Sequence, residues 1–138
     1  MTVDSIRDGI VIDHIPCKCG MKLYDLLKLS DLNVPVAMMQ NVTSRKMGRK
    51  DIIKIDADID VNLDVIGYVA PEATVCFIKN GELSEKMSLK LPERLVDVVQ
   101  CKNPRCITST EQELPHIFKL TDPDKKIYRC IYCETQAK

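Results

Sequence analysis

The chain has few aromatic residues: no tryptophan, two phenylalanines and four tyrosines among 138 residues. So few rings leave little surface on which nucleic-acid bases could stack. An excess of one charge is also missing, because 20 basic residues balance 20 acidic ones, whereas nucleic-acid-binding domains are usually basic. No apolar run approaches the roughly 20 residues that cross a bilayer, and the N-terminus lacks the apolar stretch of a signal peptide. These absences predict a cytoplasmic protein with neither nucleic-acid nor membrane partners.

Motifs of the common catalytic classes are missing as well. The sequence has no Walker loop, no H-E-x-x-H motif and no nucleophile with a base at recognisable spacing. Asp13 and His14 are neighbours in an apparent strand, where adjacent side chains point to opposite faces, so they are not expected to form a dyad. A small metalloenzyme that uses Asp13 and His14 is therefore only a secondary alternative.

The hydrophobic pattern of residues 1–96 predicts an α+β domain. Alternation of apolar residues indicates strands, apolar residues at helical spacing indicate helices, and Asn80-Gly81 between two strand-like runs indicates a hairpin. The expected elements are a strand over 9–15, a helix over 20–32, strands over 33–42 and 50–57, a helix ended before Pro71 over 61–71, and the hairpin over 73–89. This order is that of the ferredoxin-like split βαβ fold with one added strand.

Cysteine spacing gives the strongest motif. Four of the seven cysteines form the pattern Cys101-x4-Cys106 and Cys130-x2-Cys133, which is typical of one tetrahedral Zn²⁺ held by four thiolates. Four protein ligands leave no open position for water, so the ion is expected to be structural. Residues 97–138 are expected to form a small antiparallel-β domain that is too short for a core of its own without the metal. Four unrelated buried cysteines are the alternative, and His116 lacks the spacing of a ligand.

A basic stretch, residues 44–55, offers a candidate anion site. In the predicted strand from Lys50, alternation places Lys50, Ile52 and Lys54 on one face. An isoleucine between two ammonium groups suits a ligand with an apolar ring and anionic groups, such as a nucleoside triphosphate. Asp13 or His14 could contact the base or ribose, and Lys86 could add a cation if the hairpin brings it close. A solvated strand face is the simpler alternative.

Several segments together carry a family resemblance: "GIVIDHIP" at 9–16, "MGRKDIIKI" at 47–55, "YVAPEATV" at 68–75, "LPERL" at 91–95 and the cysteine pattern. In this order they resemble the regulatory chain of aspartate carbamoyltransferase. The resemblance implies a non-catalytic subunit of pyrimidine biosynthesis that forms homodimers and binds the catalytic chains through its zinc domain. It also implies one structural zinc, held by Cys101, Cys106, Cys130 and Cys133, and ATP, CTP or UTP as allosteric effectors.

The resemblance further implies which residues contact the effector. They match, position by position, the segments that line the family's effector pocket: Ser5, Ile6, Val11, Asp13, His14, Lys50, Ile52, Lys54, Ile78 and Lys86. The alternative function is a zinc-ribbon nucleic-acid module, which would use the basic stretch and the slight excess of basic residues after residue 100.

Overall fold

A computed structural model describes residues 7–137 and divides the chain into two compact units, Met1–Lys90 and Leu91–Lys138. The division falls six residues before the boundary predicted between residues 96 and 97. Strand β6 (Arg94–Val96) explains the difference, because it pairs with β7 (Ile117–Asp122) in the second unit. Among the described residues, no helix is long and apolar enough to cross a membrane.

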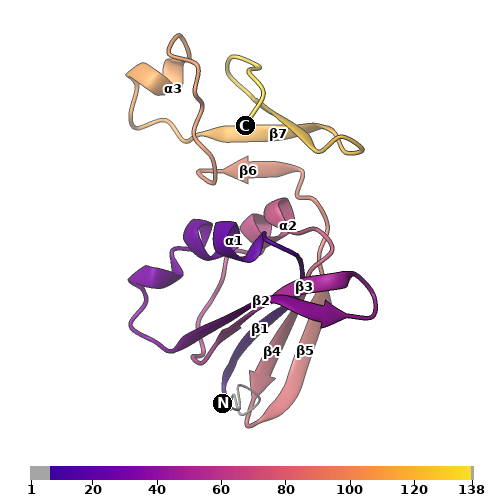
Figure 1. Cartoon of the computed structure of the whole chain (residues 1–138). Coiled ribbons are helices and arrows are strands. Elements are labelled where there is room, and N and C mark those ends of the chain that lie inside the picture. The colour runs from indigo at the N-terminus through magenta and orange to yellow at the C-terminus, as the bar shows by residue number, and fades with distance from the viewer. Residues whose placement is uncertain (1–6, 138) are drawn as a thin grey trace. The chain divides into compact units, whose positions relative to one another are not determined.

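The first unit is a five-stranded antiparallel sheet of order β2-β3-β1-β4-β5, with α1 and α2 together on one side of it (Figure 1). Its elements are β1 (Gly9–Pro16), α1 (Gly20–Leu26), the 3-10 helix η1 (Leu29–Asp31), β2 (Val36–Ser44), β3 (Gly48–Ile55), α2 (Leu63–Val69), β4 (Thr74–Lys79) and β5 (Glu82–Ser88). This is the predicted split βαβ arrangement, with β5 as the added strand, so the fold prediction is confirmed.

Apolar side chains that alternate along the strands form the core on the helix side of the sheet. The most buried members are Ile10, Ile12, Ile15, Leu23, Ile53, Ile55, Ile66 and Val75. Helix α1 is shorter than the predicted helix over 20–32, because Lys28 adopts a left-handed conformation at φ 55° and the chain continues as η1. Helix α2 begins at a true N-cap, since the Asn62 side chain accepts hydrogen bonds from the N–H groups of Asp64 and Val65.

Two β-bulges flank β3. Between the pairs Ile12–Ile53 and Ile15–Asp51, β1 has two residues where β3 has one. A matching irregularity interrupts the pairing of β2 with β3 between Met39 and Val42. Each bulge contains a residue with left-handed backbone, His14 at φ 58° and Asn41 at φ 62°, a conformation that is uncommon outside glycine. A bulge resets the alternation of the strand that carries it, so strict alternation does not hold at these points.

The buried carboxylate of Asp51 joins the pieces around β3. It is fully buried and accepts backbone N–H groups from Lys18 at 3.0 Å, Gly20 at 2.9 Å and Asn41 at 2.9 Å. Gly20 is needed at the start of α1, because a Cβ there would lie 2.8 Å from Asp51 Oδ2. One side chain thereby fixes the β1–α1 turn and the bulge of β2 to the central part of the sheet.

The second unit is a three-stranded antiparallel sheet of order β6-β7-β8, with β8 spanning Ile127–Cys130 and a short helix α3 at Ile107–Thr110. Its apolar core has only a few large side chains: Leu95, Phe118 and Tyr128 are almost fully buried. The Tyr128 hydroxyl donates to the Pro92 carbonyl at 2.6 Å. The other buried side chains include Cys101, Cys106 and Cys130, so the predicted small antiparallel-β domain with a cysteine cluster is confirmed.

Replacing Asp51 by alanine should destabilise the first unit strongly. Three backbone N–H groups lose their acceptor, and each buried donor left unsatisfied costs about 1–3 kcal/mol. We expect the free energy of unfolding in urea to fall by at least about 3 kcal/mol. Asp58→Ala, at an exposed position, is the matched control and should unfold like the wild type; equal stability of the two variants would contradict the role given to Asp51.

Candidate metal centre and effector face

The sulfur atoms of Cys101, Cys106, Cys130 and Cys133 all lie within 4.8 Å of one another. The Cys101–Cys133 pair is separated by 3.5 Å and the Cys106–Cys130 pair by 3.7 Å. A tetrahedral ion with metal–sulfur bonds of about 2.3 Å has sulfur–sulfur edges of about 3.8 Å, whereas a disulfide bond measures about 2.05 Å. The cysteines are free thiols, and their spacing fits one tetrahedral zinc ion.

The four sulfur atoms come from two pairs of cysteines that are close in the sequence, Cys101 with Cys106 and Cys130 with Cys133, and a separate turn positions each of these sequence pairs. In the first turn, the Asn103 carbonyl accepts the N–H of Cys106 at 3.0 Å and the hydroxyl of Ser109 at 2.7 Å. The second pair lies at the end of β8, where the N–H of Glu134 donates to the Cys130 carbonyl at 2.8 Å. Cys130 is the last residue of the strand and Cys133 lies in the following turn. Local hydrogen bonds therefore set the geometry within each pair, and the fold brings the two pairs together.

Polar neighbours adjust the chemistry of the sulfur atoms. Asn103 Nδ2 donates to Thr135 Oγ1 at 3.2 Å, and Thr135 Oγ1 lies 3.2 Å from Cys133 Sγ, so the Thr135 hydroxyl can donate to a Cys133 thiolate. Burial raises the pKa of the Cys133 thiol, but hydrogen bonds from Thr135 and Asn103 outweigh burial and lower it to about 6. Burial raises the pKa of Cys101 to about 12. Without metal, Cys133 is therefore the first of these two ligands to ionise.

His116 supports the cluster from outside it. Its Nδ1 atom accepts the backbone N–H of Cys101 at 3.1 Å, and its own backbone N–H donates to Asp97 Oδ1 at 2.8 Å. The potential metal-binding group found among residues 7–137 consists of the four cysteines alone. His116 thus orients the backbone of one cysteine, a role that the sequence did not reveal because the contact joins residues that are 15 positions apart.

The sheet of the first unit assembles a row of candidate effector-binding residues. Lys54 lies opposite Val11, Val11 lies opposite Cys76, and Cys76 lies opposite Lys86 in successive strand pairs. Directly opposite residues share a face and lie about 5 Å apart at Cβ. Their neighbours Ile53, Ile55 and Val75 point into the core. The predicted residues Val11, Lys54 and Lys86 therefore lie together on the face away from that core.

Asp13 and His14 reach the same face as this row. Asp13 Oδ1 forms an ion pair with Lys50 Nζ at 2.8 Å, and His14 Nδ1 lies 3.1 Å from the hydroxyl of Thr74, the residue opposite Asp13. The expectation that Asp13 and His14 point to opposite faces is therefore wrong, because the bulge in β1 breaks the alternation. Thr74 was not predicted, although alternation along β4 places it two positions before Cys76 and four before Ile78, on the same face.

The charge state of Asp13 depends on these contacts. Burial raises the pKa of Asp13, but the hydrogen bond from Lys50, the backbone N–H of His14 and the positive charges of both neighbours outweigh burial, and the pKa lies below its ordinary value. Asp13 is consequently ionised at neutral pH. It partly neutralises Lys50. Lys54 and Lys86 are the two cations of the row itself.

The other residues predicted to contact the effector differ in their position and burial. Ile52 lies between Lys50 and Lys54 on β3 and is only 9% exposed, and Ile78 is half-buried opposite Gly9. Burial raises the pKa of the Cys76 thiol in the middle of the row, so this cysteine is a neutral, weakly polar surface there. Ser5 and Ile6 lie outside the described residues.

Comparison with known proteins matches each of the two units to a domain model of the same family. Residues 1–90 match the sequence model described as aspartate carbamoyltransferase regulatory chain, allosteric domain, and residues 93–138 match the model of its metal binding domain. The chain belongs to the aspartate carbamoyltransferase regulatory chain family. It has the allosteric and metal-binding domains of that family, and these domains are regulatory rather than catalytic.

Relatives that carry the family's name match over nearly their whole length. The regulatory chain of Clostridium tetani is 46% identical over 135 residues, 97% of this chain and 94% of the relative. That of Clostridium acetobutylicum is 44% identical over 134 residues, with coverage of 97% and 92%. That of Bifidobacterium longum is 42% identical over 138 residues, with coverage of 100% and 99%. These matches favour a regulatory subunit over the nucleic-acid module and the metalloenzyme.

Cys106→Ser should abolish stable metal binding. Cys106 is almost fully buried within the cluster, and a serine hydroxyl is a much poorer ligand than a thiolate. We expect the variant to lose its metal, measured by elemental analysis after dialysis, and to lose the near-ultraviolet signal of Tyr128. Cys76→Ser is the matched control, because Cys76 lies outside the cluster, and its metal content should not change. Full metal retention in Cys106→Ser would rule out the four-cysteine site.

Proposed function

We propose that this chain binds ATP, CTP or UTP on the outer face of the five-stranded sheet and transmits that binding to the catalytic chains of aspartate carbamoyltransferase. The observation that carries the proposal is the row Lys54–Val11–Cys76–Lys86, in which two cations border an uncharged centre. Four adjacent strands at about 4.8 Å spacing separate the two lysine Cα atoms by roughly 14 Å. A ligand that engages both therefore has to be extended and has to carry negative charge.

The chemistry around the row suits a nucleotide. Val11, Ile52 and Cys76 offer apolar contact for a base, while the ammonium groups of Lys54 and Lys86 neutralise phosphate oxygens by charge-assisted hydrogen bonds. Asp13 and His14, held by Lys50 and Thr74, supply acceptors and donors for the ribose or the edge of the base. Lys54 and Lys86 are thus assigned to the phosphates, and Asp13 and His14 to the ribose or the base. Ile78, Ser5 and Ile6 are assigned as further contacts.

The second unit then supplies the connection to the enzyme. Zinc bound by four thiolates has no open position, so it is structural, one ion per chain, and its binding free energy stabilises the folded unit. We infer that this unit docks on catalytic chains in the cytoplasm, where their product feeds pyrimidine synthesis. We also infer that regulatory chains pair with each other, supported by the outer edges of β2 and β5, which have no neighbour in the described sheet.

Allosteric control requires the effector to bind two states of the assembly with different affinity. The resulting coupling is reciprocal, so the catalytic ligand must change nucleotide affinity by the same factor. Couplings of about 1–3 kcal/mol are typical, which corresponds to changes of roughly 5- to 150-fold in affinity.

Removing both lysines at the ends of the row should weaken nucleotide binding. In Lys54→Ala/Lys86→Ala we expect the dissociation constants for ATP and CTP, measured by calorimetry, to rise about tenfold or more, because each charge-assisted hydrogen bond contributes about 1.5–3 kcal/mol. Lys46→Ala is the matched control: Lys46 belongs to the same basic stretch but is exposed in the turn between β2 and β3. Unchanged affinity in the double variant would show that the effector binds elsewhere.

Metal removal should separate the regulatory chain from the catalytic chains. A strong chelator, or a mercurial followed by a chelator, takes the ion from the four sulfur atoms and unfolds the docking unit. Size-exclusion chromatography should then show free catalytic subunits, and adding back zinc should restore the assembly. An assembly that persists after complete loss of metal would contradict a metal-dependent docking unit.

A further inference from the structure

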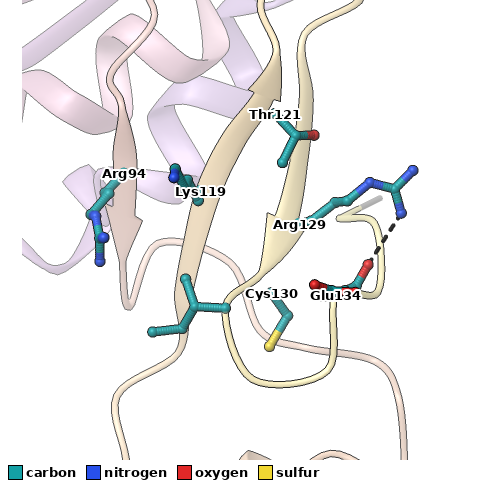
Figure 2. Close-up of a pocket in the computed structure, with 7 residues that line it drawn as sticks. Arg94, Lys119, Thr121, Arg129, Cys130 and Glu134 are labelled. Carbon is teal, nitrogen blue, oxygen red and sulfur yellow. Dashed lines mark hydrogen bonds between the residues drawn. The ribbon is translucent and has the colours of Figure 1, made fainter.

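Three of the seven cysteines lie outside the metal cluster. The four cysteines of the cluster are gathered around one point, and Figure 2 shows one of them, Cys130, among the residues that line the adjacent hollow. Of the other three, Cys76 lies on β4, whereas Cys17 and Cys19 lie together between β1 and α1. Two free thiols on either side of a single residue, away from the cluster, are a candidate for thiol–disulfide chemistry.

The backbone between β1 and α1 brings these two cysteines close together. The N–H of Cys19 donates to the Pro16 carbonyl at 2.9 Å, and Lys18 has left-handed backbone at φ 75°, as the third residue of a type II turn does. Residues two positions apart in a strand are separated by about 6.6 Å at Cα, but helix-like tightness shortens this distance to roughly 5.4 Å. Disulfides join Cα atoms about 4.4–6.8 Å apart. The turn therefore holds Cys17 and Cys19 at a distance that a disulfide can span.

The turn is fixed by contacts that do not involve sulfur. Asp51 Oδ2 accepts the N–H of Lys18 at 3.0 Å and the N–H of Gly20 at 2.9 Å, and these two residues flank Cys19. Its other oxygen accepts the N–H of Asn41, so three N–H groups offset the charge of this buried carboxylate. Because the turn is already closed, joining the two sulfur atoms costs little further chain entropy.

Basic groups surround the two thiols. Lys18 lies between them and is exposed. Cys17 Sγ donates to Asn41 Oδ1 at 3.3 Å, and Arg49 Nη1 donates to the carbonyl of the same Asn41 at 3.1 Å. Both cysteines are half-buried, and partly exposed thiols in electropositive surroundings are the reactive ones in proteins. Such surroundings attract an oxidant that carries a net negative charge.

We propose that Cys17 and Cys19 are a modification site, which a small anionic disulfide of the glutathione disulfide class converts to a reversible disulfide within the turn, and that this bond weakens effector binding on the adjacent sheet face. The second part rests on the proposed function. The first part stands on the turn alone.

The reaction consists of two thiol–disulfide exchanges. The thiolate of one cysteine attacks a sulfur atom of the small disulfide, whose sulfur–sulfur bond breaks and releases one small thiol, leaving a mixed disulfide. The second cysteine attacks the protein sulfur of this mixed disulfide and releases the second small thiol. The protein dithiol loses two electrons and two protons, and the two leaving thiols take them up. A ring closed over one residue is strained, so reducing thiols reopen it.

The position of the turn connects this bond to the effector face. Pro16, which precedes Cys17, lies opposite Lys50 on β3, and Lys50 pairs with Asp13. Oxidation also removes the hydrogen that Cys17 donates to Asn41 in the bulge of β2. The disulfide therefore alters the contacts of β1 and β2 beside the part of β3 where the predicted effector residues begin.

The test for the site treats the metal-loaded chain with glutathione disulfide, blocks the remaining thiols and maps the chain after digestion with trypsin. Trypsin cuts after Lys18, so the fragments that contain Cys17 and Cys19 separate in the reduced chain and stay joined in the oxidised one. We expect the joined pair in the wild type and in the matched control Cys76→Ser, and its separation by dithiothreitol. In Cys19→Ser, Cys17 has no partner and should retain one glutathione.

The test for the effect on the effector is calorimetry with ATP before and after oxidation. The dissociation constant of the wild type should rise about threefold or more, which is the scale of one ordinary hydrogen bond. Cys17→Ser/Cys19→Ser is the matched control and should show no change after the same treatment, since its hydroxyl groups keep the hydrogen bond to Asn41 but form no disulfide. Elemental analysis checks that oxidation leaves the metal in place.

Each outcome decides a separate claim. Unmodified Cys17 and Cys19, lasting glutathione on the wild-type pair, or disulfides among the cluster cysteines in their place would overturn the modification site. Equal ATP affinity of the oxidised and the reduced wild type would overturn the effect on the effector and leave the site standing. A reduced wild-type chain that binds neither ATP, CTP nor UTP would overturn the proposed function, while the trypsin map would still decide the site.

Discussion

Four sulfur atoms gathered around one point are the constraint on which the second half of the chain depends. The unit from Leu91 to Lys138 has Leu95, Phe118 and Tyr128 as its large buried apolar side chains, which is little core for a chain of this length. Structural zinc sites contribute on the order of 10 kcal/mol at neutral pH, more than these three buried side chains together at about 1.5–3 kcal/mol each. The ion therefore acts as the centre of the domain, and the sheet with its outer face is arranged around it.

In the first unit, strand β3 has the corresponding role. One side of it carries Asp51, whose carboxylate holds the β1–α1 turn and the bulge of β2. The other side carries Lys50, Ile52 and Lys54. The contacts that stabilise the fold and the residues proposed to contact the effector thus alternate along one strand. The bulge beside β3 costs a left-handed backbone at His14, and strained conformations of this kind are retained where the surrounding structure requires them. Here the bulge brings His14 to the face that carries Asp13.

The sequence predicted much of this arrangement, but not all of it. The cysteine spacing gave the four members of the metal cluster, since short spacings within each pair specify tight turns. Asn80-Gly81 gave the hairpin of β4 and β5, because those two residues favour the turn that joins adjacent antiparallel strands. Asp13 and His14 were placed on opposite faces, since a bulge has no clear signature in the residues that form it. Asp51, His116 and Thr74 were missed for a related reason: each acts through a partner at least ten residues away.

By itself, the sequence determined the order of helices and strands, the presence of a second, cysteine-rich unit and the four cysteines that form its cluster. These features follow from periodicity and spacing within short segments, where physical preference is local. Only the tertiary structure decided that Lys54, Val11, Cys76 and Lys86 form one row. Register between strands distant in the chain is set by long-range pairing and by bulges, and a shift of one residue would have turned residues of this row to the opposite face.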